Sequence, residues 1–309
     1  MPVPASLIGI ATEPVIHPVD SRWLMAYAAS IGSHDACYLD TRRDGGVVGH
    51  PLFPVCLEWP AVLALRDRLL SAGLTSEEAA RGVHYTHDLT VHRLARPGDR
   101  LSTTARLASV SVQRSGALAV IELVTVDESG QPVATTMMGT VYRDTPVAGA
   151  ADLGAVVPRR HTVPAQPSTS DARDPSGRFA YRLPIHHNAA HVYTECARIW
   201  NPIHTDPRTA ERAGLPGIIL HGTATLAMAI SGVVSQEASG QPQRIRHIGA
   251  RFVGMVPIPT EIEIRILDRR RRNGTSDGLQ VDGDLVTFDV RGGTGQVVLS
   301  HGTAVVAGP

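Results

Sequence analysis

The chain repeats one order of expected elements in its two halves, and this repeat limits the folds open to it. In each half a helical stretch precedes four strand-like runs. The first half places them at residues 55–72, then 84–94, 101–112, 117–126 and 133–143. The second half places them at about 222–236, then 244–253, 260–268, 285–290 and 296–306. This order predicts two copies of a unit that packs one helix against antiparallel strands.

A short alignment supports an old duplication. Residues 32–38 fall on residues 198–204 at a constant separation of 166 positions, and Tyr27 precedes Tyr193 by the same 166 positions. Between the halves, residues 145–177 are rich in Pro, Ala, Ser and Asp and show no sustained period, which is typical of a linker. We therefore expect an N-terminal repeat at 1–144, a linker at 145–177 and a C-terminal repeat at 178–309.

The periodicity within the C-terminal half indicates a buried helix and a half-buried strand. Residues 223–230 carry no charge on any face, as expected of a helix that protein surrounds on all sides. Ile262, Ile264 and Ile266 alternate with charged residues, which gives a strand with one apolar face.

Composition excludes several classes of partner. The chain has 309 residues, 43% of them hydrophobic, so it can bury the cores of two ordinary domains. Its 29 basic and 29 acidic residues cancel, so no global field attracts nucleic acid or an anionic membrane. No apolar run is long enough to cross a bilayer, and residues 1–4 lack the basic start of a secretory signal. We expect a cytoplasmic protein.

Neither cysteines nor histidines predict a metal site. Cys37, Cys56 and Cys196 have no disulfide or zinc spacing and are interpreted as small buried residues. His187 and His191 share a helical face, but no third ligand has suitable spacing. We predict no metal and no cofactor.

One motif predicts chemistry. In the run 200–206, the Asn201-Pro202 pair ends the preceding helix, because proline disfavours helical geometry before it, and turns Asn201 and His204 outward. After Gly222 a helix begins, and its first turn leaves N–H groups without helical partners. Such donors can stabilise negative charge that develops on an oxygen atom.

These residues resemble the signature of the MaoC-like, type-2, (R)-specific enoyl-CoA hydratases. That signature reads roughly Gly-Asp-x-Asn-Pro-Leu-His, followed by Pro-Ile-Leu-His-Gly. The chain matches it at Asn201, Pro202, Ile203, His204, Leu220, His221 and Gly222, and has Tyr193 where the family often has a tyrosine. The resemblance implies an α+β double hot dog, in which two repeats, each a helix wrapped by an antiparallel sheet, form a pseudo-dimer.

The sequence departs from the signature at the aspartate. Ile199 stands in its place, and Arg198 replaces the preceding glycine. In the family the carboxylate and the histidine hold and deprotonate the water that adds to the double bond. The resemblance therefore implies a hydro-lyase with an incomplete dyad, acting on an acyl thioester of coenzyme A or a carrier protein.

The resemblance gives each site residue an expected role. His204 would be the base, whose ordinary pKa is about 6.5; Asn201 would orient water or the imidazole, and the Gly222 N–H would stabilise the thioester oxygen. Expected substrate contacts are Tyr193, Ile199, Trp200, His221 and Arg251. Asp206 and Glu195 could supply the missing carboxylate, although Asp206 before Pro207 is also a typical helix cap. His221 could instead shape only the start of the helix.

Other features allow two interpretations. Ser33, Asp35 and Tyr38 occupy the matching positions of the first half, either as a degenerate site beside room for an acyl tail or as a polar surface cluster. The cluster at residues 269–274 is interpreted as a solvated loop, or alternatively as a contact for phosphates. Relatives turn through Pro-Gly-Asp where this chain has Pro257–Glu261.

Three functional hypotheses remain at this level. The first is hydration or dehydration of an acyl thioester. The second is proton transfer, elimination or cyclisation on a polyketide-type intermediate by His204 alone. The third is a non-catalytic acyl-binding subunit. A homodimer is compatible with all three.

Overall fold

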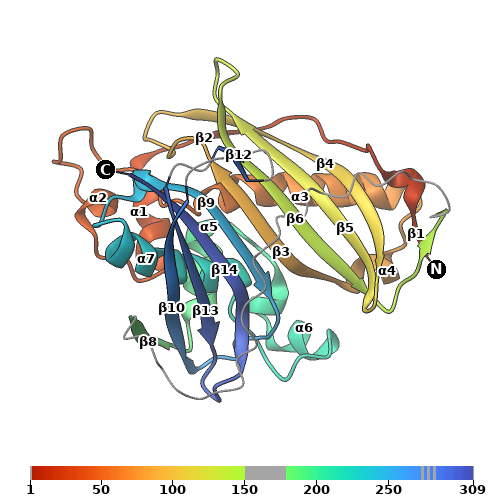
Figure 1. Ribbon diagram of the computed structural model, residues 1–309. Coiled ribbons are helices and arrows are strands. Elements are labelled where there is room, and N and C mark those ends of the chain that lie inside the picture. The colour runs from red at the N-terminus through yellow and green to blue at the C-terminus, as the bar shows by residue number, and fades with distance from the viewer. Residues whose placement is uncertain (1, 150–178, 273–274, 277–278, 281–282, 309) are drawn as a thin grey trace.

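A continuous antiparallel sheet of ten strands organises the molecule (Figure 1). The computed structural model describes residues 2–149, 179–272, 275–276, 279–280 and 283–308. The strand order is β2-β4-β5-β6-β3-β9-β14-β13-β10-β8, and every neighbouring pair is antiparallel. The first five strands come from the N-terminal half and the last five from the C-terminal half.

The N-terminal half contains the helices η1 (Ala5–Leu7), α1 (Ser21–Ser30), α2 (Ala36–Leu39), α3 (Pro54–Ser71) and α4 (Ser76–Ala80). Its strands are β1 (Val3–Pro4), β2 (Val15–Pro18), β3 (Gly82–Val91), β4 (Arg100–Gln113), β5 (Gly116–Val126), β6 (Pro132–Arg143) and β7 (Val147–Ala148).

The C-terminal half contains the helices α5 (Ala189–Ala197), η2 (Pro202–His204), α6 (Pro207–Arg212), α7 (Gly222–Glu237) and η3 (Pro242–Arg244). Its strands are β8 (Ala180–Ile185), β9 (Ile245–Phe252), β10 (Thr260–Arg272), β11 (Thr275–Ser276), β12 (Leu279–Gln280), β13 (Gly283–Arg291) and β14 (Val297–Ala307).

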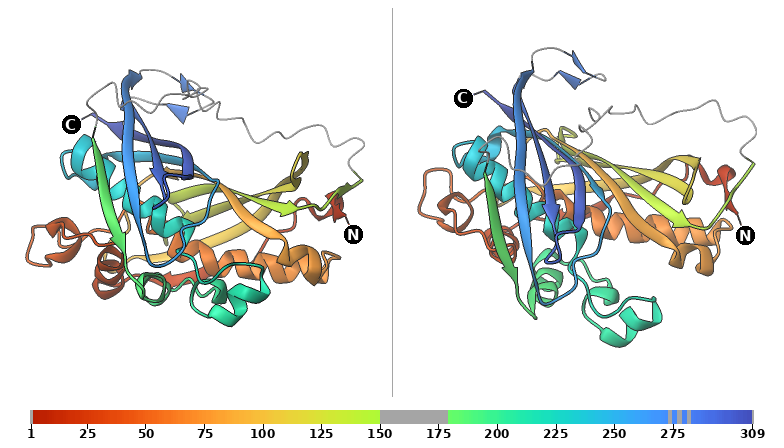
Figure 2. Two further views of the ribbon diagram at one scale, coloured as in Figure 1. Left: turned by 90° about the horizontal axis from the view of Figure 1, so that it is seen from below. Right: turned by 60° about the horizontal axis from the view of Figure 1, so that its bottom comes forward.

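The two long helices cover one face of the sheet, as the views in Figure 2 show. Helix α3 packs on β4 and β5, whereas α7 packs on β9, β10, β13 and β14. Ten of the residues of α7 are buried, from Ala224 to Val234, so the expectation of an apolar helix inside a sheet is confirmed. This is the double hot dog that the sequence predicts.

A pseudo-two-fold relation connects the halves. Outward from the central β3–β9 pair, one half continues with β6, β5, β4 and β2, and the other with β14, β13, β10 and β8, so corresponding strands hold corresponding places. Helix α1 packs against α5. Tyr27 and Tyr193 meet at this contact, with ring centroids 5.9 Å apart. Because these tyrosines are the ones that the 166-residue separation matches, the structure supports the alignment inferred from sequence.

Two expectations need correction or fall outside the structure. The arginines at 269–272 lie on strand β10, which pairs with β13, and not on a loop. Arg269 and Arg271 form ion pairs with Asp284 of β13. Most of the expected linker at 145–177 lies outside the described residues. None of the described helices is long and apolar enough to cross a membrane.

Candidate active site

His204 lies at the end of the short helix η2, where the Asn201-Pro202 turn places it. The Asn201 side chain caps η2 by accepting from the Ile203 N–H at 3.5 Å. The Nδ1 atom of His204 lies 2.8 Å from the carbonyl oxygen of Ile219. A carbonyl can only accept, so Nδ1 carries the proton and the lone pair of the neutral ring is on Nε2. Nε2 makes no hydrogen bond within the described part of the chain.

The His204 ring stacks on His221. Their centroids are 3.7 Å apart at an interplanar angle of 26°. Burial lowers the pKa of His204 to about 4, although its bond to the Ile219 carbonyl opposes this shift. Burial and the neighbouring His204 lower the pKa of His221 to about 2. Both rings are therefore neutral near pH 7, which leaves Nε2 of His204 available as a base.

His221 is also the N-cap residue of α7, so the stacked pair brings His204 to the start of this helix. Within the described residues, the His221 side chain makes no capping hydrogen bond to the first turn of α7. A Cβ atom at Gly222 would come within 2.9 Å of the Phe252 ring of β9. Glycine therefore lets the helix end approach the sheet while its first N–H groups stay uncapped.

A pocket of about 270 Å³ opens beside η2. Residues of α5 and of the turn that follows it line this pocket, namely His191, Thr194, Glu195, Trp200, Asn201, Pro202 and Thr205. Of the residues predicted for the site, Asn201, Trp200 and Glu195 line this pocket, whereas His204 and Gly222 are not among its lining residues. Trp200 is 56% exposed. His191 is held at the rim by the Thr205 carbonyl, 3.0 Å from its Nε2.

Ile199 and Arg198 occupy the positions at which the sequence departs from the signature. Ile199 is buried in the core and offers no polar group from its side chain. Arg198 has a left-handed backbone, with φ 58° and ψ 36°, which is the conformation that glycine adopts most easily. Its guanidinium lies 3.9 Å from the centre of the Trp23 ring of α1.

Tyr193 and Thr194 of α5 contact the residues at the start of α7. The Tyr193 hydroxyl donates to Thr223 Oγ1 at 3.1 Å, and its ring lies 4.9 Å from that of His221. Thr194 Oγ1 lies 3.2 Å from Nε2 of His221. Because Tyr193 is fully buried, its contacts here are with protein groups.

Two residues predicted for the site point elsewhere. The Asp206 carboxylate caps α6 by accepting from the Arg208 N–H and the Thr209 hydroxyl, so the helix cap that the Asp206-Pro207 pair indicated is confirmed. Arg251 precedes Phe252 on β9, and alternate side chains of a strand project to opposite faces. Since Phe252 faces Gly222, Arg251 projects away from the helix end.

The N-terminal half has a corresponding turn and short helix without the base. Asp35 precedes α2 as Asn201 precedes η2, and Tyr38 takes the place of His204. Tyr38 is fully buried, 5.5 Å from His50 between ring centroids, so its assignment to a polar surface cluster is wrong. Burial raises the pKa of Tyr38 well above its usual value, which rules out base catalysis by its hydroxyl near pH 7.

Sequence reasoning missed three contributors: the Ile219 carbonyl, Phe252 and Thr194. The carbonyl belongs to the backbone and leaves no residue-type signal. Phe252 reaches the site only through sheet pairing. The described residues contain no group of three or more His, Cys, Asp or Glu arranged to bind a metal.

Family models match each half. A MaoC-like domain matches residues 172–287, and a FAS1-like dehydratase domain region matches residues 6–136. The C-terminal half is thus similar to MaoC-like domains, and the N-terminal half to the dehydratase region of FAS1-like proteins. The chain's "3-hydroxyacyl-thioester dehydratase Y" relative from Mycobacterium tuberculosis is 26% identical over 82% of this chain and 83% of the relative.

Solved structures agree on the fold. A MaoC-like dehydratase from Phytophthora capsici superposes with a TM-score of 0.76 at 22% identity, over 97% of this chain and 96% of that one. A Mycobacterium tuberculosis protein described as a double hot dog has a TM-score of 0.57 at 14% identity, over 96% of each chain.

Some relatives are much longer than this chain. Peroxisomal multifunctional enzyme type 2 from Drosophila melanogaster is 28% identical over 77% of this chain, but the match spans only 39% of the relative.

Proposed function

We propose that this protein hydrates or dehydrates an acyl thioester, interconverting enoyl and 3-hydroxyacyl forms on coenzyme A or a carrier protein. The observation that supports this most is the Nδ1 bond from His204 to the Ile219 carbonyl, which leaves Nε2 as a free base beside the uncapped start of α7. The names of relatives, among them a 3-hydroxyacyl-thioester dehydratase, support the same reaction.

One imidazole is sufficient for a balanced dehydration. Nε2 accepts the proton from the α-carbon, and the resulting negative charge moves to the thioester oxygen, where the Gly222 N–H stabilises it. The electron pair then forms the carbon–carbon double bond as the C3–O bond breaks. The imidazolium returns its proton to the leaving hydroxyl, so water departs and the ring is neutral again. Hydration is the reverse.

Glu195 is our candidate for the carboxylate that the dyad lacks. It lines the same pocket as Asn201, whereas the Asp206 carboxylate is engaged in helix capping. A carboxylate at this position would hold the water or hydroxyl by accepting its hydrogen bond.

The test is hydration of crotonyl-CoA and of longer enoyl-CoAs, followed by loss of enoyl absorbance. We expect His204→Gln to lower kcat by about 10²-fold or more, since general-base catalysis contributes about that much. His187→Gln, an exposed histidine outside the pocket, is the matched control and should retain activity. Glu195→Gln should lower kcat more than Glu211→Gln, which alters an exposed carboxylate on α6.

The pH profile gives a second readout. Because the base must be unprotonated, kcat/KM should fall as pH drops through about 4, the pKa of His204, and not near the ordinary histidine value. Wild-type protein that leaves all enoyl thioesters unchanged would contradict the proposal and favour the polyketide-type or the non-catalytic alternative. Full activity of His204→Gln would remove the histidine from the mechanism.

A further inference from the structure

A second cavity lies away from the pocket beside η2, against helix α2 of the N-terminal half. Its volume is about 340 Å³. Three separate segments line it. Helix α2 and the loop after it contribute Cys37, Arg43, Asp44, Gly45, Gly46 and Val48. The end of β3 and the following turn contribute Val91, Arg93, Leu94 and Arg96, and the C-terminal half contributes Gln243 and Arg246. It shares no lining residue with the pocket beside η2.

The lining is strongly basic. It contains the four arginines 43, 93, 96 and 246 and a single carboxylate, Asp44, although the whole chain has a net charge of +0. A local concentration of positive charge in a neutral protein indicates an anionic ligand and not a general attraction to polyanions.

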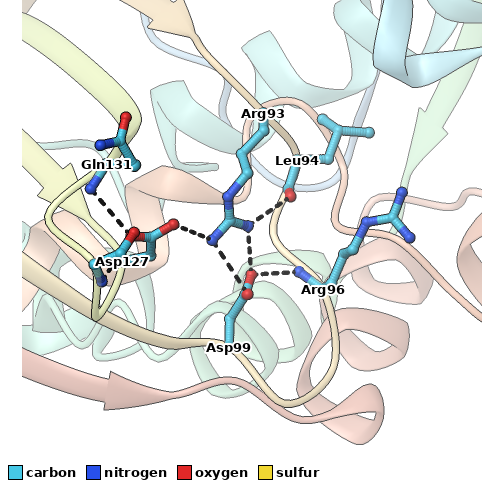
Figure 3. Close-up of polar contacts among 7 residues, drawn as sticks. Arg93, Leu94, Arg96, Asp99, Asp127 and Gln131 are labelled. Carbon is cyan, nitrogen blue, oxygen red and sulfur yellow. Dashed lines mark hydrogen bonds and ion pairs between the residues drawn. The ribbon is translucent and has the colours of Figure 1, made fainter.

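Arg93 is the arginine whose charge the protein already neutralises (Figure 3). Its guanidinium pairs with Asp99 at 2.8 Å and with Asp127 at 3.3 Å, and it donates to the Leu94 carbonyl. Asp99 in turn accepts from the Arg96 backbone N–H at 2.8 Å. This network fixes the turn that carries Arg96, whose side chain extends away from the Arg93–Asp99 pair.

The other three guanidinium groups keep their charge available. Within the described residues, Arg43, Arg96 and Arg246 form no ion pair with a carboxylate. Arg246 is held by one bond from Nη1 to the His92 carbonyl, at 3.3 Å. On other surfaces, by contrast, arginines such as Arg106 and Arg269 are paired directly with carboxylates.

Glycines let the loop approach these cations. Gly45 and Gly46 have φ values of 80° and 69°, in the left-handed region. A Cβ atom at position 45 would lie 3.7 Å from Nη1 of Arg96, so a larger side chain there would project toward the guanidinium. Gly45 therefore lets the loop backbone pass close to the Arg96 guanidinium at the wall of the cavity.

We propose that this cavity binds a diphosphate-bearing small molecule. Guanidinium groups match the geometry of phosphate oxygens through paired N–H donors. Three positive charges suit the multiple negative charges of a diphosphate better than the single negative charge of a carboxylate ligand. The ligand is either an inorganic diphosphate or a nucleoside diphosphate, and this site is independent of the hydratase function proposed above.

Calorimetric titration of the full chain tests the site, with inorganic pyrophosphate, ADP and inorganic phosphate as probes. We expect pyrophosphate or ADP to bind, and the double variant Arg43→Ala/Arg96→Ala to weaken binding by about tenfold or more, because charge-assisted bidentate bonds are lost. Arg42→Ala is the control, since Arg42 lies beside Arg43 but pairs with Asp40 and does not line the cavity. Binding should also weaken at high salt.

The outcomes are distinct. Tighter binding of ADP than of pyrophosphate assigns a nucleotide, and the reverse assigns the inorganic anion. Absence of binding by both diphosphates, or equal loss of affinity in Arg42→Ala and the double variant, would overturn the proposal. Crotonyl-CoA hydration by the double variant, measured in parallel, separates this result from the fate of the hydratase proposal.

Discussion

At the scale of single residues, a backbone carbonyl takes over part of the role of the signature aspartate that this chain lacks. Ile199 cannot accept a proton or a hydrogen bond, yet the Ile219 carbonyl fixes the tautomer of His204. Fixing the tautomer of a catalytic imidazole is one of the tasks that a carboxylate performs in catalytic triads. Ile219 does not line the pocket beside η2, so holding the water is the role that we propose for Glu195, which does line it.

At Arg198, a cation–π contact offsets the strain of a left-handed backbone. A non-glycine residue in the left-handed region costs about 1–2 kcal/mol, whereas a cation–π contact recovers about 0.5–2 kcal/mol. The contact is with Trp23, whose indole N–H also donates to the Cys196 carbonyl at the end of α5. The arginine therefore binds the end of α5 to α1 of the other half.

We predict that Arg198→Ala is less stable than Arg198→Gly by about 1 kcal/mol, because alanine keeps the strained backbone and loses the ring contact. The glycine variant should stay within about 1 kcal/mol of the wild type, since relief of strain offsets the lost contact. Urea unfolding of the three proteins measures this order. An alanine variant at least as stable as the glycine variant would contradict it.

At the scale of elements, glycines decide how closely α7 approaches its surroundings. Gly222 faces Phe252 at the helix start, and Gly232 lies against the ring of Tyr181 from β8. The Tyr181 hydroxyl donates to the Met228 carbonyl at 2.9 Å. Glycine in a helix interior is unfavourable by itself, so its presence here is explained by the close approach of an edge strand.

We predict that Gly232→Ala destabilises the protein by about 1–3 kcal/mol, as overpacking in a core does, in spite of alanine's higher helix propensity. An added Cβ would lie 2.7 Å from Cζ of Tyr181. In a Tyr181→Ala background the same substitution should become stabilising. A double-mutant cycle by denaturant unfolding reports the coupling, and additive effects would exclude the steric explanation.

At the scale of the whole molecule, the fold encloses several neutral histidines. Burial lowers the pKa of His50 to about 3, His84 to about 4 and His87 to about 3, in addition to His204 at about 4 and His221 at about 2. Below pH 6.5 the unfolded chain binds protons that the folded chain does not, so stability must fall as pH falls. Buried Glu58, whose pKa is raised to about 7, acts in the opposite direction between its ordinary value and 7.

We predict a steep loss of stability from about pH 6.5 downward, because each neutral buried histidine contributes about 1.4 kcal/mol per pH unit in that range. Five such histidines outweigh one carboxyl. Urea midpoints at about pH 7, 6 and 5 test the slope. His50→Gln should make the dependence shallower, while equal stability at all three pH values would refute the prediction.

The sequence by itself determined the repeat, the apolar helix at 222 and the strands that surround it, because these depend on local periodicity and on helix-ending residues. It also identified Asn201 and His204 as candidate site residues, since their spacing lies within one short motif. The Asp206-Pro207 pair likewise predicted a helix cap, which Asp206 forms. Only the tertiary structure decided that the Ile219 carbonyl orients the imidazole, that Glu195 lines the pocket, and that Tyr38 is buried. It alone brought Arg43, Arg96 and Arg246 to one cavity, because those contacts join segments whose separation along the chain carries no local pattern.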